Sequence, residues 1–495
     1  MMSALPKGSE TPWQLVALLP VLGVLAYWAG GEIALVALAA ALPIAVLAHR
    51  LLGRSDRPRA MSDQVIEQLD LTLAQVAARG GATGCLVIQF DDPGQLADRL
   101  GRARQCEVLA ASIARLRSAL RPGDMLYPME DGSLAVTLAA TPRLDAEIMV
   151  RIAARLHLVA QQPMTLADGP TQITCSIGFC HARQLRKPSG RALLDAEQVA
   201  GDEAARHRPG AIRGYSEDLA RARAERDTLR SGFAQAVDRG EVRAWFQPQL
   251  STDSGEVSGI EALVRWKHPE KGLLAPGAFL PAIEATDLME LLGQTMLTQS
   301  LAALAELDRH GLDVPTVAVN FSAEELRDPH LPDRLHWMLD RFALAPSRLT
   351  VEVLESVVAG DGDEVIASNL GRIATMGCGV DLDDFGTGNA SIAAIRRFAV
   401  NRLKIDRSFV RDVDQNRDQQ RLVTAVLSLA DRLGLETVAE GVETPTEHAL
   451  LAQLGCAHVQ GYVVARPMPV DELADWLLSH REKHRNALRI GVKAR

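Results

Sequence analysis

Residues 379–384 read Gly-Val-Asp-Leu-Asp-Asp, a predicted β-strand that ends in two adjacent carboxylates. Similar strands recur before and after it and alternate with helical stretches over roughly 250 residues, which predicts an α/β fold with a (β/α)₈-type barrel. Each predicted strand carries a polar or acidic residue at or near its C-terminal end; these residues are Glu261, Asn320, Glu352, Asp383, Asp384, Lys404, Glu440 and Gln460. Because the C-terminal ends of barrel strands converge on one face, we expect these side chains to form one site.

The charge of this predicted site indicates metal chemistry. Five or six carboxylates in one pocket repel each other unless cations hold them. Oxygen ligands are those that Mg²⁺ and Mn²⁺ prefer. The adjacent residues Asp383 and Asp384 suit two metal ions that share one carboxylate, an arrangement for in-line attack on phosphorus.

The same residues resemble the signature of the EAL family of cyclic di-GMP phosphodiesterases, over about 232–480. The shared motifs are EALVRW at 261–266, VNFSAEEL at 319–326, VEVLES at 351–356, DDFGTG at 383–388, LKID at 403–406, AEGVE at 439–443 and QGY at 460–462. The resemblance implies a TIM-like barrel that hydrolyses cyclic di-GMP to linear pGpG and forms a homodimer through this domain. The alternative is a non-catalytic receptor that binds cyclic di-GMP and signals to a protein partner.

The resemblance also implies a role for each matching residue. The ligands of the first metal ion would be Glu261, Asn320, Glu352 and Asp383, and those of the second would be Asp383, Asp384 and Glu440. The catalytic and supporting residues would be Lys404 at the attacking water or the developing charge, Glu355 beneath the loop after Asp384, Arg265 on a substrate phosphate, and Gln247 and Gln460 at the ligand. The structural alternatives are an ion pair for Arg265 or Lys404 and a hydrogen-bonded core for the two glutamines.

One segment departs from the family pattern. The family commonly continues DDFGTG with Tyr-Ser-Ser-Leu, whereas this chain has Asn389-Ala390-Ser391-Ile392. In the family this loop links the metal site to dimerisation. We therefore expect a looser loop or a weaker dimer, while every metal ligand is kept.

Residues 80–217 resemble a GGDEF diguanylate cyclase domain that has lost its catalytic residues. The family hairpin Gly-Gly-Asp-Glu-Phe falls on Glu130-Asp131-Gly132-Ser133-Leu134, and Gln89 replaces the first metal-binding aspartate. Without two carboxylates no magnesium ion can clamp a triphosphate, so we expect no cyclase activity. Arg121 and Asp124 keep the RxxD spacing of the family's inhibitory product site; the alternative is a polar turn that leads into a strand.

The first 54 residues predict two transmembrane helices. Two uncharged apolar runs, 13–29 and 33–48, are each close to the ~20 residues that span a bilayer. The alternative is a buried hairpin of a soluble domain. Basic residues at Lys7 and over 49–59 predict that both termini and the enzymatic domains face the cytoplasm, at the inner (cytoplasmic) membrane.

The remaining segments complete the predicted organisation. Residues 55–79 predict a connecting helix and 218–239 a charged linker helix, which leaves 240–485 for the EAL-like barrel. Hydrophobic residues make up 47% of the chain and charged residues 23%, which excludes a disordered chain. A formal net charge of −9 argues against wrapping a nucleic acid polymer by neutralising its backbone.

Overall fold

The computed structural model describes residues 61–91, 102–166, 169–284, 286–358, 363–386 and 392–493. The predicted transmembrane segments and Asn389-Ala390 lie outside these ranges. Of the helices within the described ranges, none is both long and apolar enough to cross a bilayer. The chain divides into two compact units, 1–223 and 224–495.

The first unit contains a five-stranded sheet in the order β2-β3-β1-β6-β7. Its strands are β1 (Gly84–Phe90), β2 (Met125–Pro128), β3 (Leu134–Thr137), β6 (Cys175–His181) and β7 (Ile212–Gly214), and β4 (Met164–Leu166) and β5 (Gly169–Thr171) form a separate hairpin. Side chains alternate between the two faces of a strand. Leu86 and Ile88 of β1 therefore pack with α4 (Arg102–Ala119) and α5 (Ala146–Ala160), whereas Cys85 packs on the opposite face.

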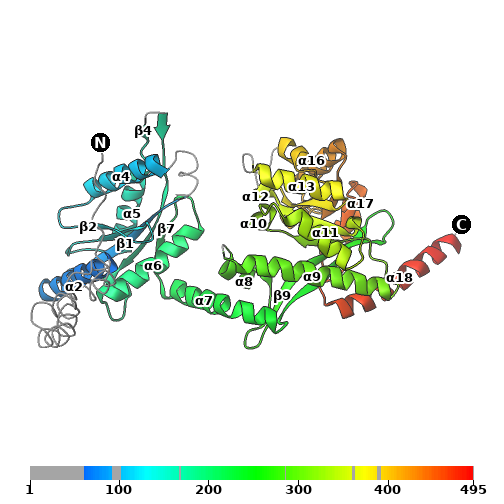
Figure 1. The fold of residues 1–495 in the computed structure, drawn as a ribbon, viewed down its shortest axis with the longest axis horizontal. Coiled ribbons are helices and arrows are strands. Elements are labelled where there is room, and N and C mark those ends of the chain that lie inside the picture. Colours follow the sequence, from blue (N-terminus) through cyan, green and yellow to red (C-terminus); the bar gives the residue numbers. More distant parts are fainter. Residues whose placement is uncertain are drawn as a thin grey trace, which may run out of the picture. The chain divides into compact units, whose positions relative to one another are not determined.

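That opposite face is covered by α2 (Met61–Arg79) and α6 (Gly190–Arg206) (Figure 1). Val65 and Leu69 of α2 are fully buried there, next to Leu193 of α6. The segment predicted as a connecting helix therefore packs within the first unit.

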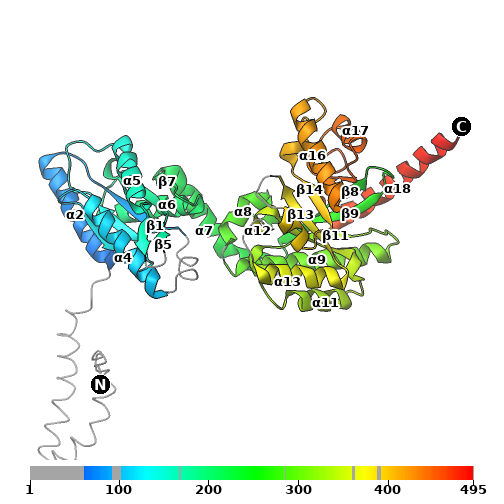
Figure 2. The same cartoon turned by 90° about the horizontal axis from the view of Figure 1, so that it is seen from above.

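The second unit is an eight-stranded barrel closed by the pairing of β8 with β9, with β10 as an added edge strand. Its strands are β8 (Val242–Ser251), β9 (Val257–His268), β10 (Gly272–Leu274), β11 (Val317–Asn320), β12 (Leu349–Leu354), β13 (Gly379–Phe385), β14 (Arg402–Ile405), β15 (Glu436–Ala439) and β16 (His458–Val459). Figure 2 shows α9 (Leu288–Arg309), α11 (Leu331–Arg341) and α13 (Glu364–Met376) on one side of these strands, and α16 (Arg417–Leu433) and α17 (Pro445–Gln453) on the other.

The regular (β/α)₈ order predicted for the barrel is wrong at β8. This strand runs antiparallel to both of its neighbours, β9 and β16, whereas the successive pairs from β9 through β16 are parallel. The physical reason is the connection between β8 and β9, residues 252–256, which is long enough for a hairpin and too short for a parallel crossover.

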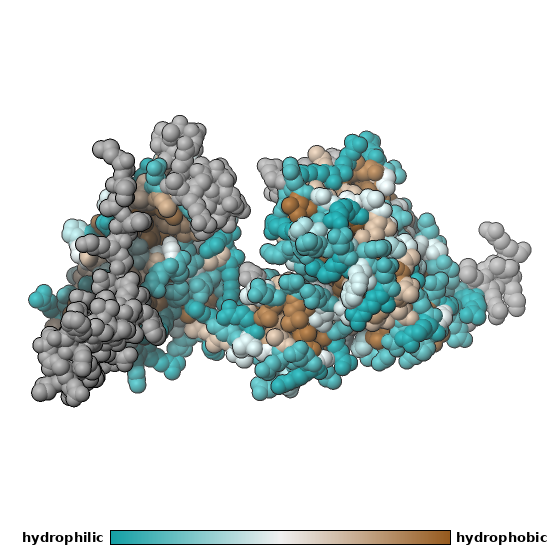
Figure 3. Space-filling view, in the orientation of Figure 1, coloured by the Kyte–Doolittle hydropathy of each residue, from teal (hydrophilic) through white to brown (hydrophobic). Residues whose placement is uncertain are grey.

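Helix α7 (Glu217–Asp238) joins the barrel through an aromatic cluster. Phe233 packs edge-on against Trp266 with ring centroids 5.5 Å apart and stacks on Phe279 of α8 (Pro276–Ile283) at 5.9 Å. Figure 3 shows hydrophobic atoms at the surface where Figure 1 places the end of α7 beside β9. The C-terminal half of the predicted linker helix is thus part of the second unit.

Candidate metal site

A β-bulge brings both adjacent aspartates to the site. The parallel strands β13 and β14 pair Asp381 with Arg402, Leu382 with Leu403, and then Phe385 with Ile405. Two residues, Asp383 and Asp384, therefore lie opposite the single residue Lys404. A bulge of this kind redirects side chains that regular alternation would send to opposite faces. The bulge holds Asp384 at φ 55°, a left-handed conformation that is uncommon outside glycine.

Lys404 lies at the centre of the site and is fully buried. Its Nζ lies within ion-pair distance of four carboxylates: Glu440 at 2.6 Å, Glu352 at 3.0 Å, Asp383 at 3.0 Å and Glu261 at 3.5 Å. These acids come from β9, β12, β13 and the end of β15. Strand ends far apart in the sequence therefore converge on one ammonium group.

Amide side chains connect the carboxylates to one another. Asn320 donates through Nδ2 to Glu261 Oε1 at 3.2 Å and to Glu352 Oε2 at 3.0 Å. Gln460 donates through Nε2 to Glu261 Oε2 and, at 3.2 Å, to Gln247 Oε1. Gln249, which is not among the predicted site residues, donates to Gln460 Oε1 at 2.8 Å.

The donor set fits two divalent cations. Oxygens of Glu261, Glu352 and Asp383 lie within 4.8 Å of one another, and so do those of Asp383, Asp384 and Glu440. Asp383 belongs to both groups, and every ligand atom is oxygen. Among the described residues no other group of acidic, histidine and cysteine side chains meets this spacing. The residues present therefore suit Mg²⁺ or Mn²⁺.

The carboxylates of the cluster outnumber its single ammonium, and burial is the main cause that raises the pKa of three of them. Burial and then the nearby Glu261 raise the pKa of Glu352 well above its usual value. Burial raises the pKa of Glu440 to about 8, and burial together with Asp383 raises that of Asp384 to about 6. Without added cations, some of these acids hold protons near neutral pH. Metal ions would replace those protons.

Two further predicted residues lie next to the cluster. Glu355, at the start of α12 (Glu355–Val358), accepts a 2.8 Å hydrogen bond from the backbone N–H of Gly386, just after the bulge. Arg265 is half-buried beside Trp245, and its pKa is lowered chiefly by burial. Its Nη1 donates to the backbone carbonyl of Val264 at 2.8 Å, and within the described ranges it has no carboxylate partner at ion-pair distance.

A cavity of about 660 Å³ opens beside the cluster. Glu261, Asn320 and Asp383 are among the residues that line it. The remaining lining is mostly apolar and includes Leu280, Met289, Leu292, Met296, Phe321 and Leu354. The cavity thus offers an apolar surface directly beside a charged centre, as sites for small organic ligands commonly do.

The first unit holds the residues predicted for an inhibitory site in a tight turn. The Asp124 carboxylate accepts the backbone N–H groups of Arg121 at 3.2 Å and Ala139 at 2.9 Å, and it is buried. The Arg121 side chain is half exposed. Asp124 therefore already serves the turn that precedes β2.

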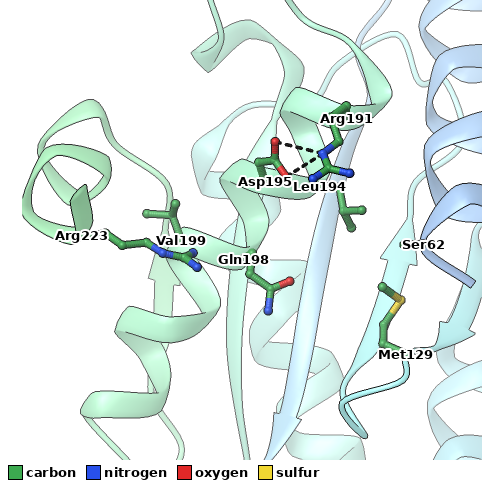
Figure 4. A pocket seen from close by; sticks show the side chains of 8 residues that line it. All are labelled: Ser62, Met129, Arg191, Leu194, Asp195, Gln198, Val199 and Arg223. Atoms are coloured by element: carbon green, nitrogen blue, oxygen red, sulfur yellow. Dashed lines mark hydrogen bonds and ion pairs between the residues drawn. The ribbon is translucent and has the colours of Figure 1, made fainter. Parts of the chain in front are cut away.

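The β2–β3 turn lies beside a pocket of about 480 Å³ in the first unit, shown in Figure 4. Asp131 in the turn accepts hydrogen bonds from the N–H and hydroxyl of Ser133. The two arginines of the pocket both have carboxylate partners: Arg191 pairs with Asp195 at 3.1 Å and Arg223 with Asp202 at 2.9 Å. This pocket therefore offers little net positive charge to a phosphate.

The fold and the acidic cluster define a class: an α/β barrel with a carboxylate-rich cluster at the C-terminal ends of its strands. Residues 230–467 match the family described as EAL domain, and residues 63–208 match the diguanylate cyclase, GGDEF domain. The chain therefore carries an EAL domain at residues 230–467, preceded by a GGDEF domain at residues 63–208.

Curated relatives align with most of this chain. The chain is 30% identical over 411 residues to the cyclic di-GMP phosphodiesterase NbdA of Pseudomonas aeruginosa, covering 81% of this chain and 51% of NbdA. It is 30% identical over 368 residues to the bifunctional diguanylate cyclase/cyclic di-GMP phosphodiesterase MucR of the same species, covering 74% and 53%. The chain thus spans about half the length of these relatives.

Among solved structures, the PaMucR phosphodiesterase in complex with c-di-GMP is 37% identical. The match covers 50% of this chain and 99% of that one, with a TM-score of 0.47.

Proposed function

We propose that the EAL domain hydrolyses one phosphodiester bond of cyclic di-GMP to give linear pGpG. The observation that carries the proposal is the convergence of four carboxylates on the buried Lys404. A buried cluster with this imbalance of charge is unstable without further cations. The names of the relatives and the cavity beside the cluster support a cyclic dinucleotide as the ligand.

Each residue of the site would have a separate role in the reaction. The two oxygen clusters would hold the metal ions, which supply a nucleophilic water and charge stabilisation on the phosphoryl oxygens when bound. Lys404 would contribute a fixed positive charge at the same point, and Arg265 would orient a substrate phosphate. Glu355, through Gly386, would hold the segment that carries Asp383 and Asp384.

Hydrolysis by the full-length protein in detergent tests this proposal. Cyclic di-GMP is incubated with the protein and Mn²⁺ or Mg²⁺, and pGpG is measured by chromatography. We expect pGpG with either ion and none after chelation with EDTA. Glu261→Gln, which removes a predicted ligand charge, should abolish product, whereas the exposed Glu270→Gln should match the wild type.

The same experiment decides between the enzyme and the alternative receptor. A receptor would bind cyclic di-GMP and leave it intact under every metal condition. The retention of all the carboxylates expected for the metal site favours the enzyme, because a receptor does not need them.

We further propose that the EAL domain forms a homodimer and that residues 1–54 anchor the protein in the inner membrane.

We also propose that the GGDEF domain is catalytically inactive and regulatory. The substitutions Gln89, Gly132 and Ser133 support the loss of cyclase activity, because an amide, a glycine and a serine cannot replace metal-binding carboxylates. Isothermal titration with GTP and with cyclic di-GMP tests nucleotide binding. A Glu261→Gln background keeps the EAL site from turning over the latter during the titration.

A further inference from the structure

A buried ion pair lies directly beneath the metal cluster. Asp381 of β13 and Arg402 of β14 are partners in the strand register, and their side chains are 1% and 10% exposed. The guanidinium contacts the carboxylate at two points: Nε lies 2.9 Å and Nη2 2.5 Å from Asp381 Oδ2. Two-point contacts of this kind fix relative position as well as charge.

The pair lies one residue pair before the β-bulge, with Leu382 and Leu403 between them. Asp381 precedes Asp383 by two residues, and Arg402 precedes Lys404 by two residues, so within each strand both side chains share one face. The last regular pairs before the bulge are Asp381 with Arg402 and Leu382 with Leu403. The ion pair therefore fixes the register from which the bulge starts.

The register decides whether the metal ligands reach the site. A shift of one residue along a strand moves every side chain to the other face. The bulge also requires the left-handed conformation of Asp384, and such strained positions persist only where the surroundings enforce them. On the C-terminal side, Glu355 holds the N–H of Gly386. On the N-terminal side, the Asp381–Arg402 pair is a buried contact between the two side chains, next to the buried pair Leu382–Leu403.

The net charge of the Asp381–Arg402 pair is also compatible with a position beside the carboxylate cluster. Asp381 and Arg402 are of opposite sign, so together they add no net charge to a site that already has excess carboxylate. A buried ion pair often contributes little to stability, and apolar side chains of similar size can replace it. Stability alone is therefore a weak reason for a charged pair at this position.

We propose that Asp381 and Arg402 are positioning residues that hold the β13–β14 bulge and thereby set the metal affinity of the cluster. This proposal rests on the metal site of the proposed function. It concerns residues that coordinate no ion themselves and act through Asp383, Asp384 and Lys404.

Mn²⁺ binding to the full-length protein in detergent tests the proposal without substrate. Free Mn²⁺ is followed by electron paramagnetic resonance during a titration. The double variant Asp381→Leu/Arg402→Met removes both charges together, so that neither is left buried alone. We expect its Mn²⁺ dissociation constant to rise by about tenfold or more, as for other residues that support metal ligands.

A matched control uses a second two-point ion pair of the barrel. Arg348 and Asp308 contact each other at 2.8 and 3.0 Å, next to the start of β12. Asp308→Leu/Arg348→Met should leave Mn²⁺ affinity unchanged. Arg402→Lys keeps the charge and loses the planar two-point contact, so it should weaken Mn²⁺ binding even if the double variant does not fold.

The outcomes separate this proposal from the proposed function. If the wild type and a folded double variant bind Mn²⁺ equally, the positioning role is wrong while the metal site stands. If the Arg402→Lys protein binds Mn²⁺ as the wild type does, the two-point contact has no role in positioning. If the wild type binds no Mn²⁺, the metal site and this proposal fail together.

Discussion

At the scale of single residues, we expect a substitution of Lys404 to affect metal binding and catalysis in different directions. Its ammonium neutralises part of the carboxylate cluster and so competes electrostatically with bound cations. Lys404→Met should therefore keep or increase Mn²⁺ affinity. The same change should lower kcat by roughly 10²–10³-fold, because a fixed charge aimed at the reacting phosphate is lost.

Glu261→Gln provides the contrast for that measurement. It removes one carboxylate charge and should weaken Mn²⁺ binding together with activity. Titrating Mn²⁺ into both variants and measuring pGpG formation at saturating Mn²⁺ separates the two effects. A Lys404→Met protein that binds Mn²⁺ more weakly than the wild type would show that the lysine supports the ligands rather than competing with cations.

Glu197 in the first unit predicts a pH dependence of stability. It is fully buried on α6, and burial raises its pKa to about 8, against about 4.3 in an unfolded chain. Between these values the unfolded state releases a proton that the folded state keeps. The free energy of unfolding should therefore fall as pH rises through this window and level off above pH 8.

Glu197→Gln removes this titration while keeping a similar shape. Denaturant unfolding is followed by circular dichroism at pH 6 and pH 8. From pH 6 to pH 8, the free energy of unfolding of the variant should increase relative to that of the wild type by up to about 2 kcal/mol. The exposed Glu107→Gln is the control and should show no such gain. Equal gains at both pH values would mean that the Glu197 side chain is not protonated in the fold.

At the scale of elements, the glycine after β16 predicts a packing defect. A Cβ at Gly461 would lie 2.1 Å from the carbonyl oxygen and 2.3 Å from the nitrogen of Val442, both backbone atoms that cannot yield cheaply. Gly461→Ala should destabilise the barrel by about 2 kcal/mol or more and displace Gln460.

In α7, a Cβ at Gly232 would meet nothing within 4 Å, so Gly232→Ala should stabilise the protein by about 0.5–1 kcal/mol. Thermal denaturation of both variants checks the two signs.

The elements also show what the sequence could predict. Strands and helices are local patterns, so the α/β order and the carboxylates at the strand ends are readable from the chain. Gln249, Asp381 and Arg402 each lie two residues from a predicted site residue, and this spacing places them on the same strand face. What the sequence alone does not contain is the register between strands. The bulge at Asp383 and the pairing of Asp381 with Arg402 depend on that register, so the sequence alone predicts neither.

At the scale of the whole molecule, the two units have separate hydrophobic cores. Each is of the size at which a domain folds as one cooperative unit. A ligand that binds only the folded state stabilises only the unit that holds it. Since both oxygen clusters lie in the barrel, Mn²⁺ should stabilise the second unit and leave the first unchanged.

Thermal unfolding with and without Mn²⁺ checks this expectation. At a Mn²⁺ concentration about 100-fold above the dissociation constant, the free energy of unfolding of the barrel should rise by ~2.7 kcal/mol. For a domain of this size, that raises the midpoint temperature of unfolding by roughly 5–10 °C. The first unit has no tryptophan among its described residues, whereas Trp245, Trp266, Trp337 and Trp476 lie in the second unit, so tryptophan fluorescence distinguishes the two; Trp13 and Trp28 belong to the predicted membrane segments. Asp383→Asn, which alters the carboxylate common to both clusters, should remove most of the shift. A shift in the transition of the first unit, or one that survives Asp383→Asn, would place Mn²⁺ elsewhere and separate the acidic cluster from metal binding.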